Sequence, residues 1–74
     1  MNFILAAKEE TLSYREFEVL ELITRGRKNR EIALALGIEE RTVRFHVENI
    51  LDKLNVSNRT GAVSYAFRMG WINN

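Results

Sequence analysis

The chain has 74 residues, a formal net charge of +1 and 46% hydrophobic residues. This length fits one domain near the lower limit for a chain that builds its own core, and such hydrophobicity argues against a disordered tail. No apolar run reaches the roughly 20 residues of a membrane-spanning helix, and residues 1–7 lack the basic start of a secretory signal. Cysteine is absent, which excludes a disulfide framework and makes a cytoplasmic location the default expectation.

The charge is unevenly distributed along the chain. Residues 1–24 hold two basic and five acidic residues, a balance of −3, whereas residues 25–59 hold eight basic and five acidic residues, a balance of +3. A local positive balance is typical of a protein that meets phosphates, but a solvated surface of mixed charge gives the same pattern. Charge alone therefore leaves both interpretations open.

The sequence predicts four helices with short connections and no strand pattern. The first helix begins after Ser13, because Ser13 and Glu16 have the spacing of a capping box, and it ends before Gly26. The second covers about residues 29–36 and turns Ile32, Ala33 and Leu36 inward.

The third helix is expected over about residues 40–54, with Asn55 as its C-terminal cap. Its aliphatic residues recur at the spacing of a single buried stripe: Val43, Val47, Ile50, Leu51 and Leu54.

The fourth helix is expected over about residues 59–69, with Asn58 as its N-terminal cap. Gly70 ends it, and Trp71 folds back on its last turn. Three of its residues are expected to point inward: Ala62, Ala66 and Met69.

Three of these residues have the spacing that a helix-turn-helix requires. Ala33 must be small because a second helix crosses over it, and Gly37 takes the positive φ of a tight turn between helices. Val43 returns to the shared core from the second of the two helices. The pattern predicts that residues 41–48 lie on a helix aimed at a DNA major groove.

The aliphatic stripe on the third helix leaves an opposite face pointing outward. The Arg44 guanidinium suits the O6 and N7 atoms of guanine, while Phe45 either packs at the edge of the core or contacts a thymine methyl. Glu48 either accepts a bond from a cytosine amino group or keeps phosphates at a distance. His46 is expected to pack rather than to bind a metal, because the chain has one His and no Cys, so neither a metal nor another cofactor is expected. The outward residues are Arg41, Arg44, Phe45, Glu48 and Asp52.

Two motifs are highly specific when taken together, namely Thr42-Val43-Arg44-x-His46-Val47 and Lys53-Leu54-x-Val56-x-Asn58-Arg59. With Asn29-x-Glu31-Ile32-Ala33 and Leu36-Gly37-Ile38 before them, they strongly resemble the LuxR/FixJ (GerE-like) helix-turn-helix over about residues 12–72. The resemblance implies an all-α, four-helix DNA-binding domain of a bacterial transcription regulator. We place this domain at residues 12–74, behind an N-terminal arm at residues 1–11.

The resemblance also implies which residues meet DNA. Its base contacts fall at Arg44, Phe45 and Glu48. Phosphate contacts are expected at seven positions, the last of which we add because it shares the outward face: Asn29, Arg30, Thr42, His46, Lys53, Arg59 and Arg41.

The partners implied are double-stranded DNA, a second copy of the chain on that DNA, and RNA polymerase, with no membrane. The fourth helix often mediates dimerisation in this family, and we place a dimer surface at Val63, Phe67 and Arg68. Covering a small core is an equally good interpretation of Val63 and Phe67. The apolar segment of residues 3–5 offers a second candidate surface.

Four residues depart from the family pattern. Tyr14 stands where Pro is usual, and Lys28 stands where Ser or Thr is usual, so the second helix must shift its cap to Asn29 or lose it. Glu39 and Glu48 stand where the family often has Ser and a polar or basic residue. These changes bear on the target sequence and on affinity rather than on the fold.

The sequence leaves two other classes of function to compare with DNA binding. A helical protein-interaction module that kept this fold and lost DNA binding is the alternative, motivated by Glu39 and Glu48. An enzyme is disfavoured, because the chain has one His, one Asp, no Cys and too few residues to enclose a cleft. Family members usually carry the module behind a sensor or receiver domain, so the chain is expected to be either a stand-alone regulator or an excised domain.

Overall fold

The computed structural model describes residues 12–72 and contains four α-helices there. They are α2 (Tyr14–Thr24), α3 (Asn29–Leu36), α4 (Glu40–Leu54) and α5 (Arg59–Arg68). The described residues contain no strand, so the predicted all-α, four-helix class is confirmed. The predicted N-terminal arm and its apolar segment lie outside the described residues. None of the helices within residues 12–72 has both the length and the apolar character that crossing a membrane requires.

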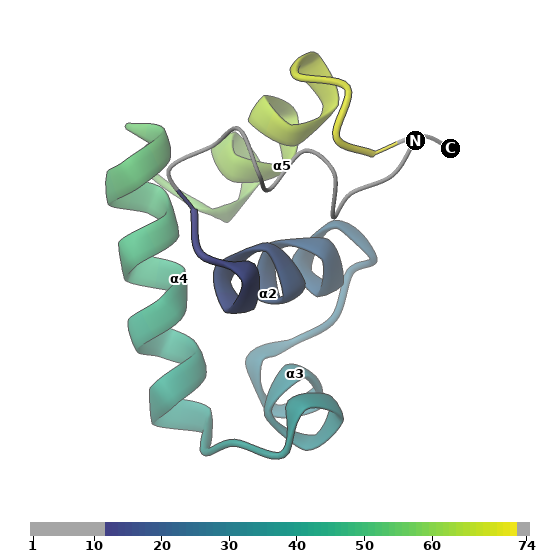
Figure 1. Cartoon of the computed structure of the whole chain (residues 1–74), viewed down its shortest axis with the longest axis vertical. Coiled ribbons are helices and arrows are strands. Elements are labelled where there is room, and N and C mark those ends of the chain that lie inside the picture. Colours follow the sequence, from purple (N-terminus) through teal and green to yellow (C-terminus); the bar gives the residue numbers. More distant parts are fainter. Residues whose placement is uncertain (1–11, 73–74) are drawn as a thin grey trace.

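The longest helix, α4, packs against each of the other three helices. Figure 1 shows α2 in the middle, with α3 and α5 on opposite sides of it and α4 running alongside all three. The stripe predicted on α4 explains this position, because Val43, Val47, Ile50 and Leu54 are all buried. Leu51 is half-buried and packs against the edge of the core.

The other helices supply the rest of the core. Ala33 on α3 is buried where α4 packs over it, as the helix-turn-helix pattern predicts. On α5 the inward residues are Ala62 and Ala66, both without exposed surface. The largest contribution comes from α2, whose buried apolar residues are Phe17, Val19, Leu20 and Ile23.

The turn between α3 and α4 has the backbone conformation expected of its glycine. Gly37 is left-handed, with φ 69°, and the Ile38 N–H donates to the Ala33 carbonyl at 3.0 Å. Asn55 ends α4 in the same conformation, with φ 57°, and the Val56 N–H donates to the Leu51 carbonyl at 3.0 Å. Both bonds close the last turn of their helix and satisfy a carbonyl that would otherwise lack a partner.

The N-terminus of α3 shows how the chain replaces the missing serine-type cap. Asn29 does not take over as the cap, and Lys28 precedes the helix without a capping side chain. Instead, the Lys28 N–H donates to the Glu31 carboxylate at 2.8 Å. The second of the two expected outcomes, loss of the side-chain cap, is therefore the one observed.

The prediction that Met69 points inward is wrong. Its side chain is 48% exposed, because α5 ends at Arg68 and the chain reverses at Gly70. The Trp71 N–H then donates to the Ala66 carbonyl at 2.9 Å, and the indole is buried in the core. The Trp71 ring lies 5.0 Å from the Phe17 ring and 5.4 Å from the Tyr65 ring, measured between centroids.

We predict that Gly37→Ala lowers the free energy of unfolding by about 1 kcal/mol. A Cβ at this position meets no atom within 4 Å, so the cost comes from the left-handed backbone alone. Gly37→Asn is the control and costs less, because Asn tolerates this conformation, as Asn55 shows. Urea unfolding followed by Trp71 fluorescence measures both variants, and an Ala variant as stable as the wild type contradicts the account.

Candidate nucleic-acid interface

The outer face of α4 is uncovered. Arg41, Arg44, Glu48 and Asp52 are exposed, as predicted. Phe45 is 59% exposed, so the alternative in which it packs at the edge of the core is wrong. The reason is the helical period: Phe45 is two residues from both Val43 and Val47, which places it on the opposite side of α4.

The charges on this face are largely balanced by neighbours on the same segment. The Arg41 Nε lies 2.8 Å from a Glu39 carboxylate oxygen, and the Arg44 Nη1 lies 3.6 Å from a Glu40 carboxylate oxygen. All four side chains are at least half exposed, so these pairs are weak and can be exchanged for other partners. The α4 face therefore offers directional groups rather than a strong positive field.

Unpaired positive charge lies instead at the start of α3. Arg27, Lys28 and Arg30 are exposed, and within residues 12–72 their side chains form no ion pair. Arg30 was predicted as a phosphate contact, but Arg27 and Lys28 were missed. Their signal in the sequence is the run of basic residues at 25–30.

An open hollow joins this region to the outer face of α4. Its walls come from the middle of α4 and from the first residues of α3 and α5. It brings together four predicted site residues from three helices: Arg44, Glu48, Asn29 and Arg59. Two of the candidate base contacts and two of the candidate phosphate contacts therefore border one continuous surface.

Two predicted phosphate contacts on α4 are half-buried, namely Thr42 and His46. The Thr42 backbone N–H donates to the Glu39 carbonyl at 3.0 Å, in the first turn of the helix. The Nδ1 atom of His46 is buried and has no hydrogen-bond partner within the described residues. The Phe45 and His46 rings lie 6.2 Å apart, measured between centroids.

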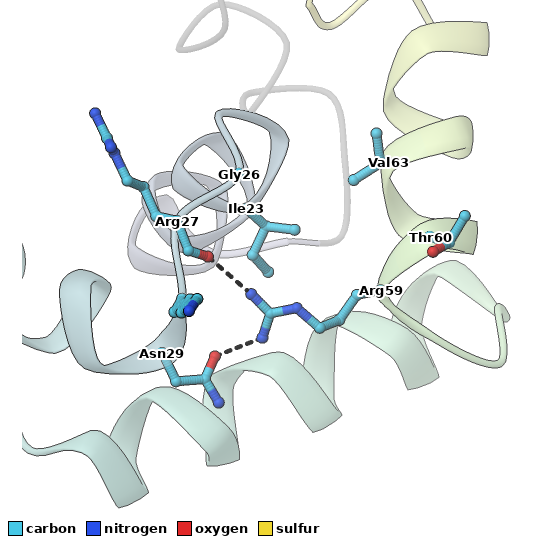
Figure 2. Close-up of a pocket in the computed structure, with 8 residues that line it drawn as sticks. Ile23, Gly26, Arg27, Asn29, Arg59, Thr60 and Val63 are labelled. Atoms are coloured by element: carbon cyan, nitrogen blue, oxygen red, sulfur yellow. Dashed lines mark hydrogen bonds between the residues drawn. The ribbon is translucent and has the colours of Figure 1, made fainter.

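Arg59 is half-buried and bonds to two other segments of the protein. It is the first residue of α5, and its Nη1 donates to the Asn29 Oδ1 while its Nη2 donates to the Arg27 carbonyl at 3.1 Å. Figure 2 shows the guanidinium reaching from α5 to the start of α3 and to the connection before it. Arg59 thus links segments that are about 30 residues apart in the sequence.

Lys53 is also engaged internally. Its Nζ lies 2.9 Å and 3.2 Å from the two carboxylate oxygens of Glu16, whose side chain is only 6% exposed. The same carboxylate accepts the Ser13 N–H at 2.8 Å, and the Ser13 Oγ accepts the Glu16 N–H at 3.1 Å, which completes the predicted capping box. One carboxylate therefore caps α2 and anchors the last turn of α4. A phosphate contact by Lys53 stays a prediction.

Burial alone would raise the pKa of Glu16. The hydrogen bonds from Lys53 and from the Ser13 backbone outweigh burial and, with the Lys53 charge, hold the pKa of this carboxyl below its usual value.

The predicted dimer residues lie on two sides of α5. Val63 is half-buried and packs against the core, as the alternative interpretation held for it. Phe67 is 45% exposed and Met69, just after the helix, is 48% exposed, while the Arg68 guanidinium lies 5.7 Å from the centre of the Tyr65 ring. The end of α5 thus exposes an aromatic side chain, an arginine and a methionine.

Comparison with known proteins agrees with this arrangement. Residues 10–66 match the family of bacterial regulatory proteins described as the luxR family. The chain is 52% identical over 61 residues to the transcriptional regulatory protein DegU of Brevibacillus brevis, covering 82% of this chain and 26% of DegU. It is 54% identical over 63 residues to the response regulator protein VraR of Staphylococcus aureus, covering 85% of this chain and 30% of VraR. The chain thus spans between a quarter and a third of the length of these relatives.

Two solved structures share the fold. The transcription factor GerE superposes with a TM-score of 0.77 at 37% identity, covering 84% of this chain and 92% of GerE. The response regulator ChrA of a heme-sensing two-component system superposes with a TM-score of 0.79 at 41% identity, covering 85% of this chain and 31% of ChrA. The resemblance inferred from the motifs is confirmed.

We predict that Glu16→Gln lowers the free energy of unfolding at neutral pH by about 1–2 kcal/mol, because the amide still accepts from Ser13 but carries no charge for Lys53. Since the pKa of Glu16 is lowered by folding, ionised Glu16 stabilises the wild type above the ordinary glutamate pKa of about 4.3. That contribution is lost as the pH falls through the lowered value. The difference between wild type and Glu16→Gln therefore narrows in acid.

Urea unfolding at a series of pH values, followed by Trp71 fluorescence, measures this effect. The control is Glu18→Gln on the same helix. It removes the surface ion pair between Glu18 and Arg15, whose charged atoms lie 3.2 Å apart. It is expected to change stability by less than about 0.5 kcal/mol. Equal effects of the two substitutions, or a difference that does not depend on pH, contradict the role of Glu16.

Proposed function

The chain belongs to the luxR family of bacterial regulatory proteins, and from this premise we propose that it binds double-stranded DNA in a sequence-specific manner with α4 in the major groove. The observation that carries the proposal is the uncovered outer face of α4, opposite its buried aliphatic stripe. A major groove about 12 Å wide accommodates a helix in this orientation. The experiment that tests the proposal is selection of preferred duplexes from a random pool, which reports affinity, half-site spacing and base preference together.

Base recognition is assigned to three exposed residues of α4. Arg44 is proposed to donate to O6 and N7 of a guanine after leaving its weak pair with Glu40. Phe45 is proposed to contact a thymine methyl, which its exposure supports. Glu48 borders the same hollow as Arg44 and is proposed to accept from a cytosine amino group.

Phosphate binding is assigned mainly to the start of α3. Asn29 and Arg30 were predicted there, and we add Arg27 and Lys28 because they are exposed and unpaired within the described residues. The predicted contacts of α4 complete the set: Arg41, Thr42, His46 and Lys53. Lys53 contributes only to the extent that it is released from Glu16.

We further propose that two copies bind neighbouring half-sites and meet through the outer side of α5, where Phe67 and Arg68 lie. The exposed aromatic side chain of Phe67 provides apolar area for such a contact. RNA polymerase is the proposed further partner of the DNA-bound protein in the cytoplasm, since the relatives DegU and VraR are a transcriptional regulatory protein and a response regulator.

One observation favours a second candidate, a protein-interaction module without DNA binding. The carboxylates of Glu39 and Glu40 neutralise both arginines on the presumed groove face. Absence of binding to any duplex in a gel-shift at low salt is the result that selects this alternative.

Arg44→Ala is predicted to weaken binding to the selected duplex by about 1–3 kcal/mol and to relax the preference at one base pair. The matched control is Arg15→Ala, which removes an arginine that also pairs with a glutamate on its own helix but lies on α2, outside the hollow. It is expected to leave base preference unchanged. Selection from the random pool with each variant measures the effect, and an unaltered preference for Arg44→Ala contradicts the assignment.

Phe67→Glu is predicted to abolish cooperative loading of two copies on a duplex with two half-sites, because the charge cannot be buried in an apolar contact. Sedimentation of the protein–duplex complex measures the number of copies bound. Leu34→Glu is the matched control, since Leu34 is an exposed apolar residue of α3. Cooperative loading that survives Phe67→Glu places the dimer contact elsewhere.

A further inference from the structure

Arg59 and Asn29 form a link between α5 and α3 at the edge of the proposed interface. The Arg59 guanidinium is half-buried and donates to two oxygens of the protein, the Asn29 Oδ1 and the Arg27 carbonyl. Figure 2 shows both bonds, with the side chain lying between the start of α5 and the start of α3. These two bonds use two of the five N–H donors of the guanidinium and hold it against the start of α3.

The chemistry of the pair determines how the Asn29 amide is oriented. A guanidinium has only donors, so it can be satisfied by the amide oxygen of Asn29 but not by the amide nitrogen. The oxygen therefore faces Arg59, and the Nδ2 with its two N–H donors faces away, as Figure 2 shows. Within residues 12–72 this nitrogen has no hydrogen-bond partner.

The freed donors lie where the proposed interface needs them. Asn29 lines the same hollow as Arg44 and Glu48, and it begins the helix that carries the unpaired positive charge. A phosphate offers only acceptors, so an asparagine that presents its nitrogen suits it, and one that presents its oxygen does not.

We propose that Arg59 is a positioning residue, which orients the Asn29 amide so that its Nδ2 donates to a DNA phosphate. This inference rests on the proposed DNA binding and revises the direct phosphate contact that the family resemblance implied for Arg59. It predicts that Arg59 and Asn29 act on DNA affinity as one unit. It also predicts that loss of Arg59 does not remove a phosphate contact of its own.

The test is a double-mutant cycle on affinity for the selected duplex, measured at several salt concentrations with the whole chain. The variants are Arg59→Gln, Asn29→Ala and the double variant, with Arg15→Gln as the measure of losing one positive charge outside the hollow. The loss of affinity caused by Arg15→Gln is subtracted from that caused by Arg59→Gln. Arg59→Gln, corrected in this way, and Asn29→Ala are each expected to weaken binding about tenfold, the size of one lost hydrogen bond to a charged group. The double variant is expected to be no weaker than Asn29→Ala alone.

Asn29→Asp separates orientation from folding. The carboxylate accepts from Arg59 at least as well as the amide, so the link and the thermal stability are retained, but the Nδ2 donors are gone. We expect binding at least as weak as that of Asn29→Ala in a protein that unfolds no earlier than the wild type. A merely structural role of Arg59 predicts instead that Arg59→Gln lowers the thermal stability but, below its unfolding transition, binds the duplex like Arg15→Gln.

Two results overturn the inference while the proposed function stands. One is an Arg59→Gln effect that persists undiminished in the Asn29→Ala background. The other concerns the slope of log affinity against log salt concentration. If Arg59→Gln reduces the magnitude of this slope by about 0.9 more than Arg15→Gln does, Arg59 itself contacts a phosphate. Failure of the wild type to bind any duplex at low salt overturns the proposed function and this inference with it.

Discussion

The packing of the aliphatic side of α4 is the constraint on which the rest of the structure depends. Val43, Ile50 and Leu54 are sealed against α2, α3 and α5, and in a helix of 3.6 residues per turn this burial fixes the direction of every other side chain. Arg44 and Phe45 are exposed because they occupy the remaining arc. The burial that holds the domain together therefore also presents the face that is proposed to read DNA.

Two long side-chain links hold the surroundings of α4 in place. Glu16 joins the first turn of α2 to the last turn of α4 through Lys53, and Arg59 joins the start of α5 to the start of α3. Both links use a residue that the family resemblance implied as a phosphate contact. Two of the positively charged side chains of the domain, Lys53 and Arg59, thus bond within the protein. The cations without an ion pair are concentrated before and at the start of α3 among the described residues.

Local signals predicted the helices well, because each signal acts over a few residues. The Ser13 capping box, the turn at Gly37 and the period of the aliphatic stripe all reappear in the structure. The partners of Lys53 and Arg59 were not predictable in this way, since they lie 37 and 30 residues distant and depend on how the helices pack. The prediction that Met69 points inward was wrong for a related reason. It extended the helical period one residue past the end of α5, where the chain turns.

Methylation interference on a selected duplex tests the central claim most directly, because methylation of guanine N7 alters only the floor of the major groove. The account predicts that methylation of guanine N7 within each half-site prevents binding, since the outer face of α4 must approach that atom. Interference from adenine N3 in the minor groove, with none from guanine N7, would contradict the placement of α4.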